Sequence, residues 1–296
     1  MIGDDIRQDT KKTDFTAKMK EYRKKEKAMY NVGFIGMGNM GTAILKGLLK
    51  TYRPDQLVFT QPTEEKGKRT EAETGVKYAA TNEEIAKNAE ILVLAVKPQF
   101  YNSVLPEIGE VLAKDAIVIS LAPGVTIDSI REKLGGKGRI VRCMPNTPAM
   151  IGEGMTGVCY DETLFSEKER KDIQDIFESF GEMQLVPEHL MDVVTCLSGS
   201  SPAYVYMFIE ALADAGVKHG MPRAAAYKFA AKAVAGSAEM VLKTGKHPAE
   251  LKDNVCSPGG TTIAGVAALE EYGLRNAVLK ASDACYDVCT AMKDKK

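Results

Sequence analysis

The sequence predicts an α/β fold in which a doubly wound parallel sheet is followed by an all-α C-terminal domain. Short, continuous apolar runs, typical of strands buried on both faces of a parallel sheet, alternate with helical stretches through the first half of the chain. After residue 187 the strand signal disappears and only helical patterns follow, several with proline in the first turn. The 296 residues are enough for two such domains.

The composition excludes several classes of protein. A formal net charge of -1 gives no support to nucleic-acid or bulk membrane binding. No apolar run approaches the roughly 20 residues that a membrane helix needs. The 6 cysteines form neither a C-x-x-C pair nor a cysteine-histidine cluster, which favours a reducing, cytoplasmic compartment. Cys285 and Cys289 lie four residues apart on a predicted helix, where two buried thiols are favoured over half a metal site.

The N-terminus differs in composition from the rest of the chain. Residues 1–29 are dense in lysine and in acidic residues and lack the apolar core of a secretory signal. We therefore predict a charged, disordered extension over residues 1–29. A dinucleotide-binding domain is expected over residues 30–187, and an all-helical domain over residues 188–296.

A glycine motif organises the first domain. A buried strand at residues 32–35 leads into Gly36, Gly38 and Gly41, and a helix follows at residues 42–49. In a dinucleotide fingerprint the first glycine makes a tight turn, the second admits a pyrophosphate and the third lets the helix pack closely. The order strand, turn and helix favours that function over a glycine-rich turn of some other α/β protein.

The end of the second predicted strand, residues 56–60, bears on the choice of cofactor. An acidic side chain about 20 residues past the glycine motif would bind the ribose 2'-hydroxyl of NAD. Here Thr60 is followed by Gln61 and Pro62, with no acid before Glu64. The nearby basic residues, which are favourable to a 2'-phosphate unless they form a solvated helix face, are Lys66, Lys68 and Arg69. The pattern favours NADP, with NADH still a possible donor.

The remaining elements follow in order. Further strands are predicted at residues 91–96, 116–121, 140–142, 154–160 and 182–186, and helices at residues 82–87, 101–112, 167–180, 202–217, 222–244, 248–254, 262–271 and 274–292. Ligands of doubly wound sheets bind at the carboxyl ends of strands. Lys97 and Pro98, together with residues 122–124, are therefore expected to border the cofactor.

The alanine-rich helices of the second half predict an oligomer. Residues 224–238 carry few charges on any face. A helix that is apolar nearly all round must be buried, and a domain of about 110 residues offers limited interior. We therefore predict a tight homodimer through the helical domain.

Two polar loops in the second half are candidate sites. Residues 251–262, LKDNVCSPGGTT, present free backbone N–H groups at the positive end of a helix, which is the geometry of a carboxylate or phosphate site. The alternative is an ordinary helix start with Thr261 or Thr262 as N-cap. Residues 197–202, LSGSSP, are the second candidate, for which a structural turn between domains is favoured.

Together these motifs resemble one enzyme family. GFIGMGNMG, LAVKPQ, RCMPNTP, LSGSSPAY and above all LKDNVCSPGGTTIAGVAALE resemble pyrroline-5-carboxylate reductase, over residues 30–289. The resemblance implies a Rossmann domain and a helical domain that interlocks with that of a partner subunit, in homodimers that assemble further into a decamer. It also implies hydride transfer from NAD(P)H to the C=N carbon of 1-pyrroline-5-carboxylate, which yields L-proline in the last step of proline biosynthesis.

The resemblance also implies site residues. Those for the cofactor are Gly36, Met37, Gly38, Asn39, Met40, Gly41, Thr60, Asn82, Ala95, Val96, Lys97, Pro98, Leu121, Ala122 and Pro123. Those for the substrate are Glu188, Asn254, Gly260, Thr261 and Thr262. The backbone N–H groups of the last three are expected to hold the carboxylate. The hydroxyl of Thr262, the catalytic group, is expected to bond the ring nitrogen as an orienting group or proton relay.

The chain departs from the family pattern at three positions, and two other functions compete. Pro123 replaces an alanine and lacks a backbone N–H, Ser201 replaces a glycine, and Cys196 replaces another residue just before it. A β-hydroxyacid dehydrogenase would use a helix lysine, for which the formal candidates are Lys228, Lys232 and Lys252. A nucleotide-sensing binding protein would keep the fold without catalysis.

Overall fold

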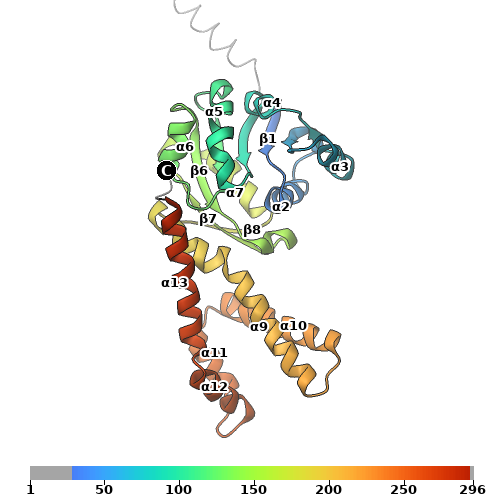
Figure 1. The fold of residues 1–296 in the computed structure, drawn as a ribbon, viewed down its shortest axis with the longest axis vertical. Helices are drawn as coiled ribbons and strands as arrows, with labels where there is room; N and C mark the ends of the chain where they lie inside the picture. The colour runs from blue at the N-terminus through green and yellow to red at the C-terminus, as the bar shows by residue number, and fades with distance from the viewer. Residues whose placement is uncertain (1–28, 294–296) are drawn as a thin grey trace, which may run out of the picture. The chain divides into compact units, whose positions relative to one another are not determined.

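The computed structural model describes residues 29–293, so the extension predicted for residues 1–29 lies outside the description except for Met29. The chain divides into two compact units (Figure 1). Unit 1 contains the described residues up to Ala122, with residues 126–142 and 162–164. Unit 2 contains residues 123–125, 143–161 and everything from Phe165 onward.

Unit 1 is built on parallel strands in the order β3-β2-β1-β4-β5-β6. Their bounds are β1 (Tyr30–Ile35), β2 (Leu57–Thr60), β3 (Lys77–Tyr78), β4 (Ala89–Leu94), β5 (Ile117–Ser120) and β6 (Arg139–Met144). The direction of winding reverses between β1 and β4, where Val32 pairs with Leu57 on one side and Ile91 on the other. A doubly wound sheet binds its ligand at this reversal, beyond the carboxyl ends of the strands.

The core of unit 1 follows from the apolar runs that predicted the strands. Val32, Phe34 and Leu94 are fully buried, as strands covered on both faces require. The helices of the unit are α2 (Asn39–Leu48), α3 (Glu64–Thr74), α4 (Asn82–Asn88), α5 (Tyr101–Val111) and α6 (Ile127–Lys133). Helix α2 buries Ile44 and Leu45. The predicted N-terminal Rossmann-type domain is confirmed.

Three elements of unit 1 were not predicted, for physical reasons. Helix α3 buries only Gly67, so its sequence has no apolar periodicity to detect. Strand β3 has two residues and helix α6 has seven, and elements this short carry little periodic signal. The strand expected at residues 91–96 ends at Leu94, because Ala95 and Val96 leave the strand and lie against Gly36 of the glycine loop.

Unit 2 begins with strands and continues as helices. Strands β7 (Gly154–Cys159) and β8 (Gly181–Leu185) pair in parallel and are joined by α7 (Glu167–Glu178). The later helices are α8 (Met191–Val194), the π-helical turn η6 (Thr195–Gly199), α9 (Ser201–Lys218), α10 (Arg223–Thr244), α11 (Pro248–Val255), α12 (Thr261–Glu271) and α13 (Leu274–Lys293). From residue 186 to residue 293 the structure contains no strand, which confirms the predicted all-helical second half.

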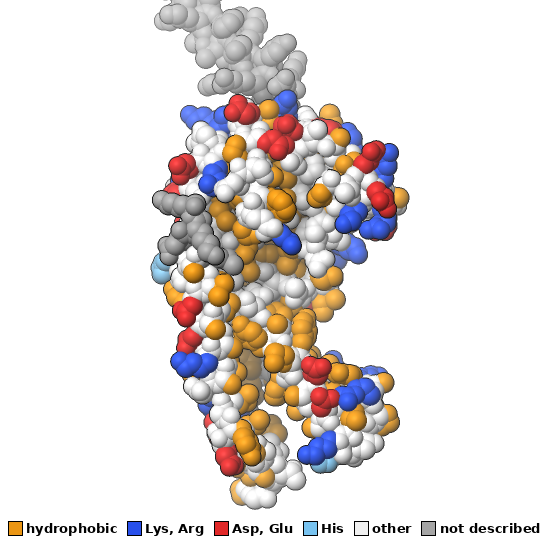
Figure 2. Space-filling view, in the orientation of Figure 1, with side chains coloured by type: hydrophobic (Ala, Val, Ile, Leu, Met, Phe, Trp, Pro, Cys, Tyr) orange, Lys and Arg blue, Asp and Glu red, His pale blue; other side chains and the backbone are white. Residues whose placement is uncertain are grey.

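The helices of unit 2 expose a large apolar surface in the single chain. Hydrophobic side chains are spread over the helical segment (Figure 2), and Phe229 and Leu242 of α10 are 68% and 72% exposed. Only Ala213, Ala226 and Ala230 are buried where α9 and α10 meet. Exposed apolar surface on this scale marks an interaction site. No helix within the described part of the chain is both long enough and apolar enough to cross a membrane.

Candidate functional site

The glycine loop between β1 and α2 has the geometry of a phosphate-binding turn. Gly36 has φ +88°, and a Cβ there would lie 2.7 Å from Cγ1 of Val96. A Cβ on Gly41 would lie 3.0 Å from the Gly36 carbonyl oxygen, so only glycine lets the helix approach this closely. A Cβ on Gly38, the N-cap of α2, would meet nothing within 4 Å. The backbone at Gly38 is therefore open to a ligand at a helix N-terminus.

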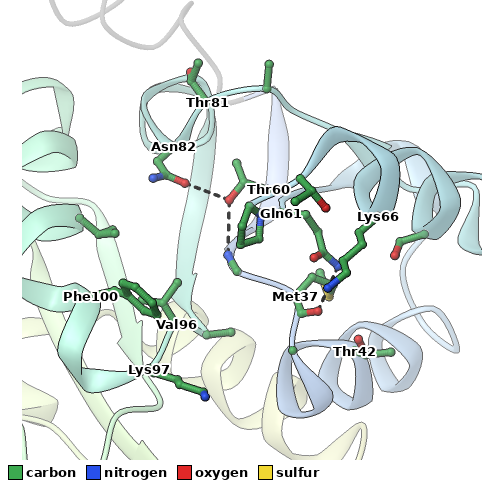
Figure 3. A pocket seen from close by; sticks show the side chains of 18 of the residues that line it. Met37, Thr42, Thr60, Gln61, Lys66, Thr81, Asn82, Val96, Lys97 and Phe100 are labelled. Carbon is green, nitrogen blue, oxygen red and sulfur yellow. Dashed lines mark hydrogen bonds between the residues drawn. The ribbon is translucent and has the colours of Figure 1, made fainter.

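A groove of about 1360 Å³ extends from this loop past the ends of β1, β2 and β4 (Figure 3). Of the cofactor residues expected from the sequence, it is lined by Gly36, Met37, Gly38, Asn39, Thr60, Asn82, Ala95, Val96 and Lys97. Met40, Gly41 and Pro98 do not line it. Leu121 and Ala122 are buried in unit 1, and Pro123 belongs to unit 2. The groove has the shape and the helix terminus that a dinucleotide requires.

A chain of hydrogen bonds fixes the walls of the groove (Figure 3). The N–H of Gly36 donates to Oγ1 of Thr60 at 3.3 Å, and the Thr60 hydroxyl donates to Oδ1 of Asn82 at 2.9 Å. Nδ2 of Asn82 then donates to Oε1 of Glu107 at 3.2 Å. Burial raises the pKa of Glu107, partly offset by the bond from Asn82. The Thr60 hydroxyl thus joins the glycine loop and the end of β2 to the start of α4.

The basic residues beyond β2 divide into two kinds. Nζ of Lys68 pairs with Oε1 of Glu64 at 2.6 Å on the exposed face of α3. Lys66 and Arg69 line the groove instead, and among residues 29–293 neither of them forms an ion pair. Gln61, at the end of β2, donates from Nε2 to the Met37 carbonyl at 3.1 Å. The groove therefore has cationic side chains near the end of β2, where a ribose would lie, and no carboxylate at the end of that strand.

The second candidate site is the turn between α11 and α12. Gly260 is the N-cap of α12 and receives no side-chain cap bond, so the alternative of a threonine N-cap is wrong. The N–H of Gly260 donates to the Ser257 carbonyl at 3.0 Å, which removes it from the expected carboxylate donors. Thr261 and Thr262 are exposed and occupy the first turn, where helix N–H groups have no partner within the helix. The anion site predicted here therefore narrows to these two residues.

Glu188 and the α11–α12 turn lie on different parts of unit 2. Glu188 is half-buried in the 3-10 turn η5 (Glu188–Leu190), and α8, which follows directly, packs against α13 and η6. Ser200, the residue that follows η6, contacts α13 at Cys285, and its Oγ lies 3.2 Å from the Sγ of that cysteine. This contact is roughly three helical turns, or about 16 Å, beyond Leu274 at the start of α13. Helix α12 leads into that start of α13 (Figure 1).

Comparison with known proteins gives a consistent result. Family models match residues 31–124 as "NADP oxidoreductase coenzyme F420-dependent" and residues 188–292 as "Pyrroline-5-carboxylate reductase dimerisation". Pyrroline-5-carboxylate reductase of Escherichia coli is 49% identical over 258 residues, which cover 86% of this chain and 96% of that protein. The enzyme of Arabidopsis thaliana is 39% identical over 85% of this chain and 91% of that protein. A crystal structure of Plasmodium falciparum pyrroline carboxylate reductase with NADP bound has a TM-score of 0.81 at 36% identity and covers 89% of this chain and 98% of that one.

Proposed function

The chain belongs to the pyrroline-5-carboxylate reductase family, and on that premise we propose that the glycine-loop groove binds NADPH and the α11–α12 turn binds the substrate carboxylate. The enzyme transfers a hydride to the C=N carbon of 1-pyrroline-5-carboxylate and forms L-proline. We favour this function over the two alternatives considered from the sequence, a β-hydroxyacid dehydrogenase and a nucleotide-sensing binding protein. The observation that carries the substrate site is the open first turn of α12, with Thr261 and Thr262 exposed after a glycine cap.

The chemistry matches the residues at the turn. A bound nicotinamide supplies the hydride, and a protonated ring imine is already electrophilic, so binding and orientation supply much of the rate. We assign the N–H groups of Thr261 and Thr262 to the substrate carboxylate, at the positive end of α12. The Thr262 hydroxyl bonds the ring nitrogen and orients it, or relays its proton. Asn254, exposed near the end of α11, and Glu188 complete the proposed substrate set.

The proposed preference for NADPH rests on the groove beyond β2. A 2'-phosphate carries about two negative charges, which Lys66 and Arg69 would pair with, and Lys46 lines the same groove. The absence of an acid at Thr60 and Gln61 removes the group that would hold a free 2'-hydroxyl. NADH remains a possible, weaker donor because the glycine loop contacts only the part that both cofactors share.

The assembly is proposed from the exposed helices. Their apolar faces are covered if α9, α10 and α13 pack against a second copy, which gives a homodimer, and by resemblance five such dimers would form a decamer. We place the enzyme in the cytoplasm, since all six cysteines are thiols rather than disulfides, as expected in a reducing compartment. Light scattering at low micromolar concentration tests the dimer, and a monodisperse monomer would contradict it.

The first experiment follows the oxidation of NADPH and of NADH by absorbance, with and without pyrroline-5-carboxylate. We expect oxidation only when the imine is present, and faster oxidation of NADPH at low cofactor concentration. Equal specificity for the two cofactors would contradict the role given to Lys66 and Arg69. No oxidation of either cofactor by folded protein would contradict the proposed sites as a whole.

A mixing experiment tests how the substrate site is composed. In one chain α13 separates the segment after Glu188 from the start of α12, so we propose that each site takes Glu188 from one subunit and Thr262 from the other. Glu188→Ala and Thr262→Ala proteins, each expected to have lowered turnover, are unfolded together and refolded. Mixed dimers would then contain one intact site, and activity should recover. If both residues act within one chain, every site in the mixture stays defective and no activity returns.

A further inference from the structure

Three cysteine side chains meet in unit 2, away from both sites described above. Cys196 lies in η6, and Cys285 and Cys289 lie one turn apart on the same face of α13. Their three Sγ atoms all lie within 4.8 Å of one another. Among the residues whose side chains the structure describes, this is the one group of potential metal ligands close enough to share an ion. The other thiols, Cys143, Cys159 and Cys256, are not part of it.

The spacing fits a three-coordinate metal site. Metal–thiolate bonds are about 2.3 Å long, so three sulfurs around one ion lie roughly 4 Å apart. The thiols therefore need to move by less than about 1 Å to reach one ion, which rotation of the Cys285 and Cys289 side chains can supply. Cys196 and Cys289 are only 4% and 6% exposed, so a bound ion would be shielded from water.

The surroundings of the thiols favour a bound cation. Ser200 lies 3.2 Å from Sγ of Cys285 and, once that sulfur is a thiolate, its hydroxyl can donate to it and orient it. Ser200 belongs to the polar segment at residues 197–202, which is not the loop expected from the sequence but the end of η6 and the start of α9, and which the proposed reaction does not use. Asp192 is 1% exposed and lies at the start of α8, which packs against η6 and α13, the two elements that carry the thiols. Polar neighbours of this kind are typical of the groups that support metal ligands.

An entry path is also present. A groove of about 600 Å³ is lined by Cys196 together with Val193, Lys280, Asp283 and Asp287. It opens from solvent onto Cys196, a residue that is otherwise buried. The groove thus gives an ion a route to the η6 side of the cluster.

We propose that Cys196, Cys285 and Cys289 form a three-thiolate site for a thiophilic d10 cation of the Cu(I) class. Cu(I) is satisfied by three soft ligands, whereas Zn(II) requires a fourth and should bind less tightly. Binding forms three metal–sulfur bonds and releases the three thiol protons to solvent, with no change of oxidation state. The ion would join η6 to α13 and so stabilise the helical segment. This proposal is independent of the proposed function.

The test is an anaerobic titration of the reduced full-length protein with Cu(I), in competition with a chromophoric Cu(I) chelator. We expect one tightly bound equivalent, a first shell of sulfur only by X-ray absorption, and a higher melting temperature with the ion. Cys196→Ala and Cys289→Ser should lose the tight equivalent, while the matched control Cys159→Ala, another buried thiol, retains it. Ser200→Ala should weaken binding by roughly tenfold or more.

The controls make each outcome decisive. Circular dichroism without metal establishes that each variant is folded. Two different cysteine variants are used so that the test still holds if one of them does not fold. The absence of a tight equivalent in the reduced wild-type protein would overturn the proposal. So would a tight equivalent that survives in both cysteine variants, because the ion would then be bound elsewhere.

Discussion

The glycine-loop region of unit 1 and the helical segment of unit 2 differ in how complete they are within one chain. In unit 1, buried strands hold a groove whose polar walls are already hydrogen-bonded through Thr60. In the helical segment, Phe229, Leu242 and Tyr272 are between 68% and 86% exposed. The groove of unit 1 is thus formed by residues of one chain, whereas the helical segment leaves apolar faces exposed that the proposed second copy would cover.

The largest expected effect comes from a substitution in the glycine loop of unit 1. Gly36→Ala places a Cβ 2.7 Å from Val96 and 3.1 Å from the Ala95 backbone, at a φ of +88°. The loop must shift, and we expect cofactor affinity, measured by NADPH fluorescence titration, to fall by two orders of magnitude or more, since strain of about 1–3 kcal/mol adds to lost contacts. Gly38→Ala is the control for folding alone, measured by its melting temperature, since its Cβ meets no protein atom within 4 Å although it would stand where the pyrophosphate is proposed to bind. An unchanged affinity in Gly36→Ala would contradict the phosphate role of the loop.

The next effect concerns the substrate turn. Thr262→Ala removes the hydroxyl proposed to bond the ring nitrogen, and turnover should fall by one to two orders of magnitude, roughly the value of one positioned hydrogen bond in the transition state. Cofactor affinity should not change, because Thr262 lies in α12 and not in the groove. Steady-state kinetics measure both quantities, and unchanged kinetics would remove Thr262 from the mechanism.

A charge introduced on the exposed apolar surface of α10 tests whether this surface forms the proposed dimer interface. Phe229→Glu replaces an exposed apolar side chain of α10, and burying a glutamate at a subunit interface is unfavourable. We expect the dimer dissociation constant, measured by analytical ultracentrifugation, to rise at least tenfold, since a buried phenylalanine contributes about 1.5–3 kcal/mol. Lys228→Gln, at the neighbouring exposed position, also lowers the net charge by one and controls for charge alone. A dimer as tight as the wild type would place the interface elsewhere.

This contrast also shows how far the sequence could lead. β4, a continuous apolar run, and α10, a long alanine-rich stretch that begins after a proline, were predicted with the correct type because their own residues determine them. Helix α3 was missed because it buries almost nothing, so its sequence lacks an apolar face. Proximity across the chain is the other limit. The meeting of Cys196 with Cys285 and Cys289 depends on how η6 packs against α13, which no local pattern encodes.

For the two sites as well, the sequence indicated the local motif but not the contacts that depend on the folded structure. The glycine spacing indicated the groove, but the sequence did not reveal that Thr60 accepts from Gly36 and donates to Asn82. It also did not separate Lys68, paired with Glu64, from Lys66 and Arg69, which line the groove. For the substrate turn, only the backbone geometry showed that Gly260 uses its N–H within the loop.

A charge change in the groove sharpens the cofactor assignment. The double substitution Lys66→Ala and Arg69→Ala should raise the KM for NADPH by about tenfold, equivalent to about 1.4 kcal/mol, and leave that for NADH nearly unchanged, because only NADPH carries the 2'-phosphate. Lys68→Ala is the matched control, since Lys68 pairs with Glu64 on the exposed face of α3. Equal losses for both cofactors would show a general rather than a phosphate-specific role.

The last effect, on stability rather than on catalysis, tests whether the groove is preorganised by its hydrogen bonds. Thr60 is 5% exposed, and Thr60→Val keeps its shape while removing the acceptor of the Gly36 N–H. An N–H left without a partner costs about 1–3 kcal/mol, so the free energy of unfolding should fall by about that amount. Thr63→Val is the control, because Thr63 is exposed and its side chain makes no cap bond at the start of α3. Urea unfolding measures both. If Thr60→Val proved no less stable than Thr63→Val, the glycine loop would hold its shape without this bond, and the cofactor rather than the protein would order the groove.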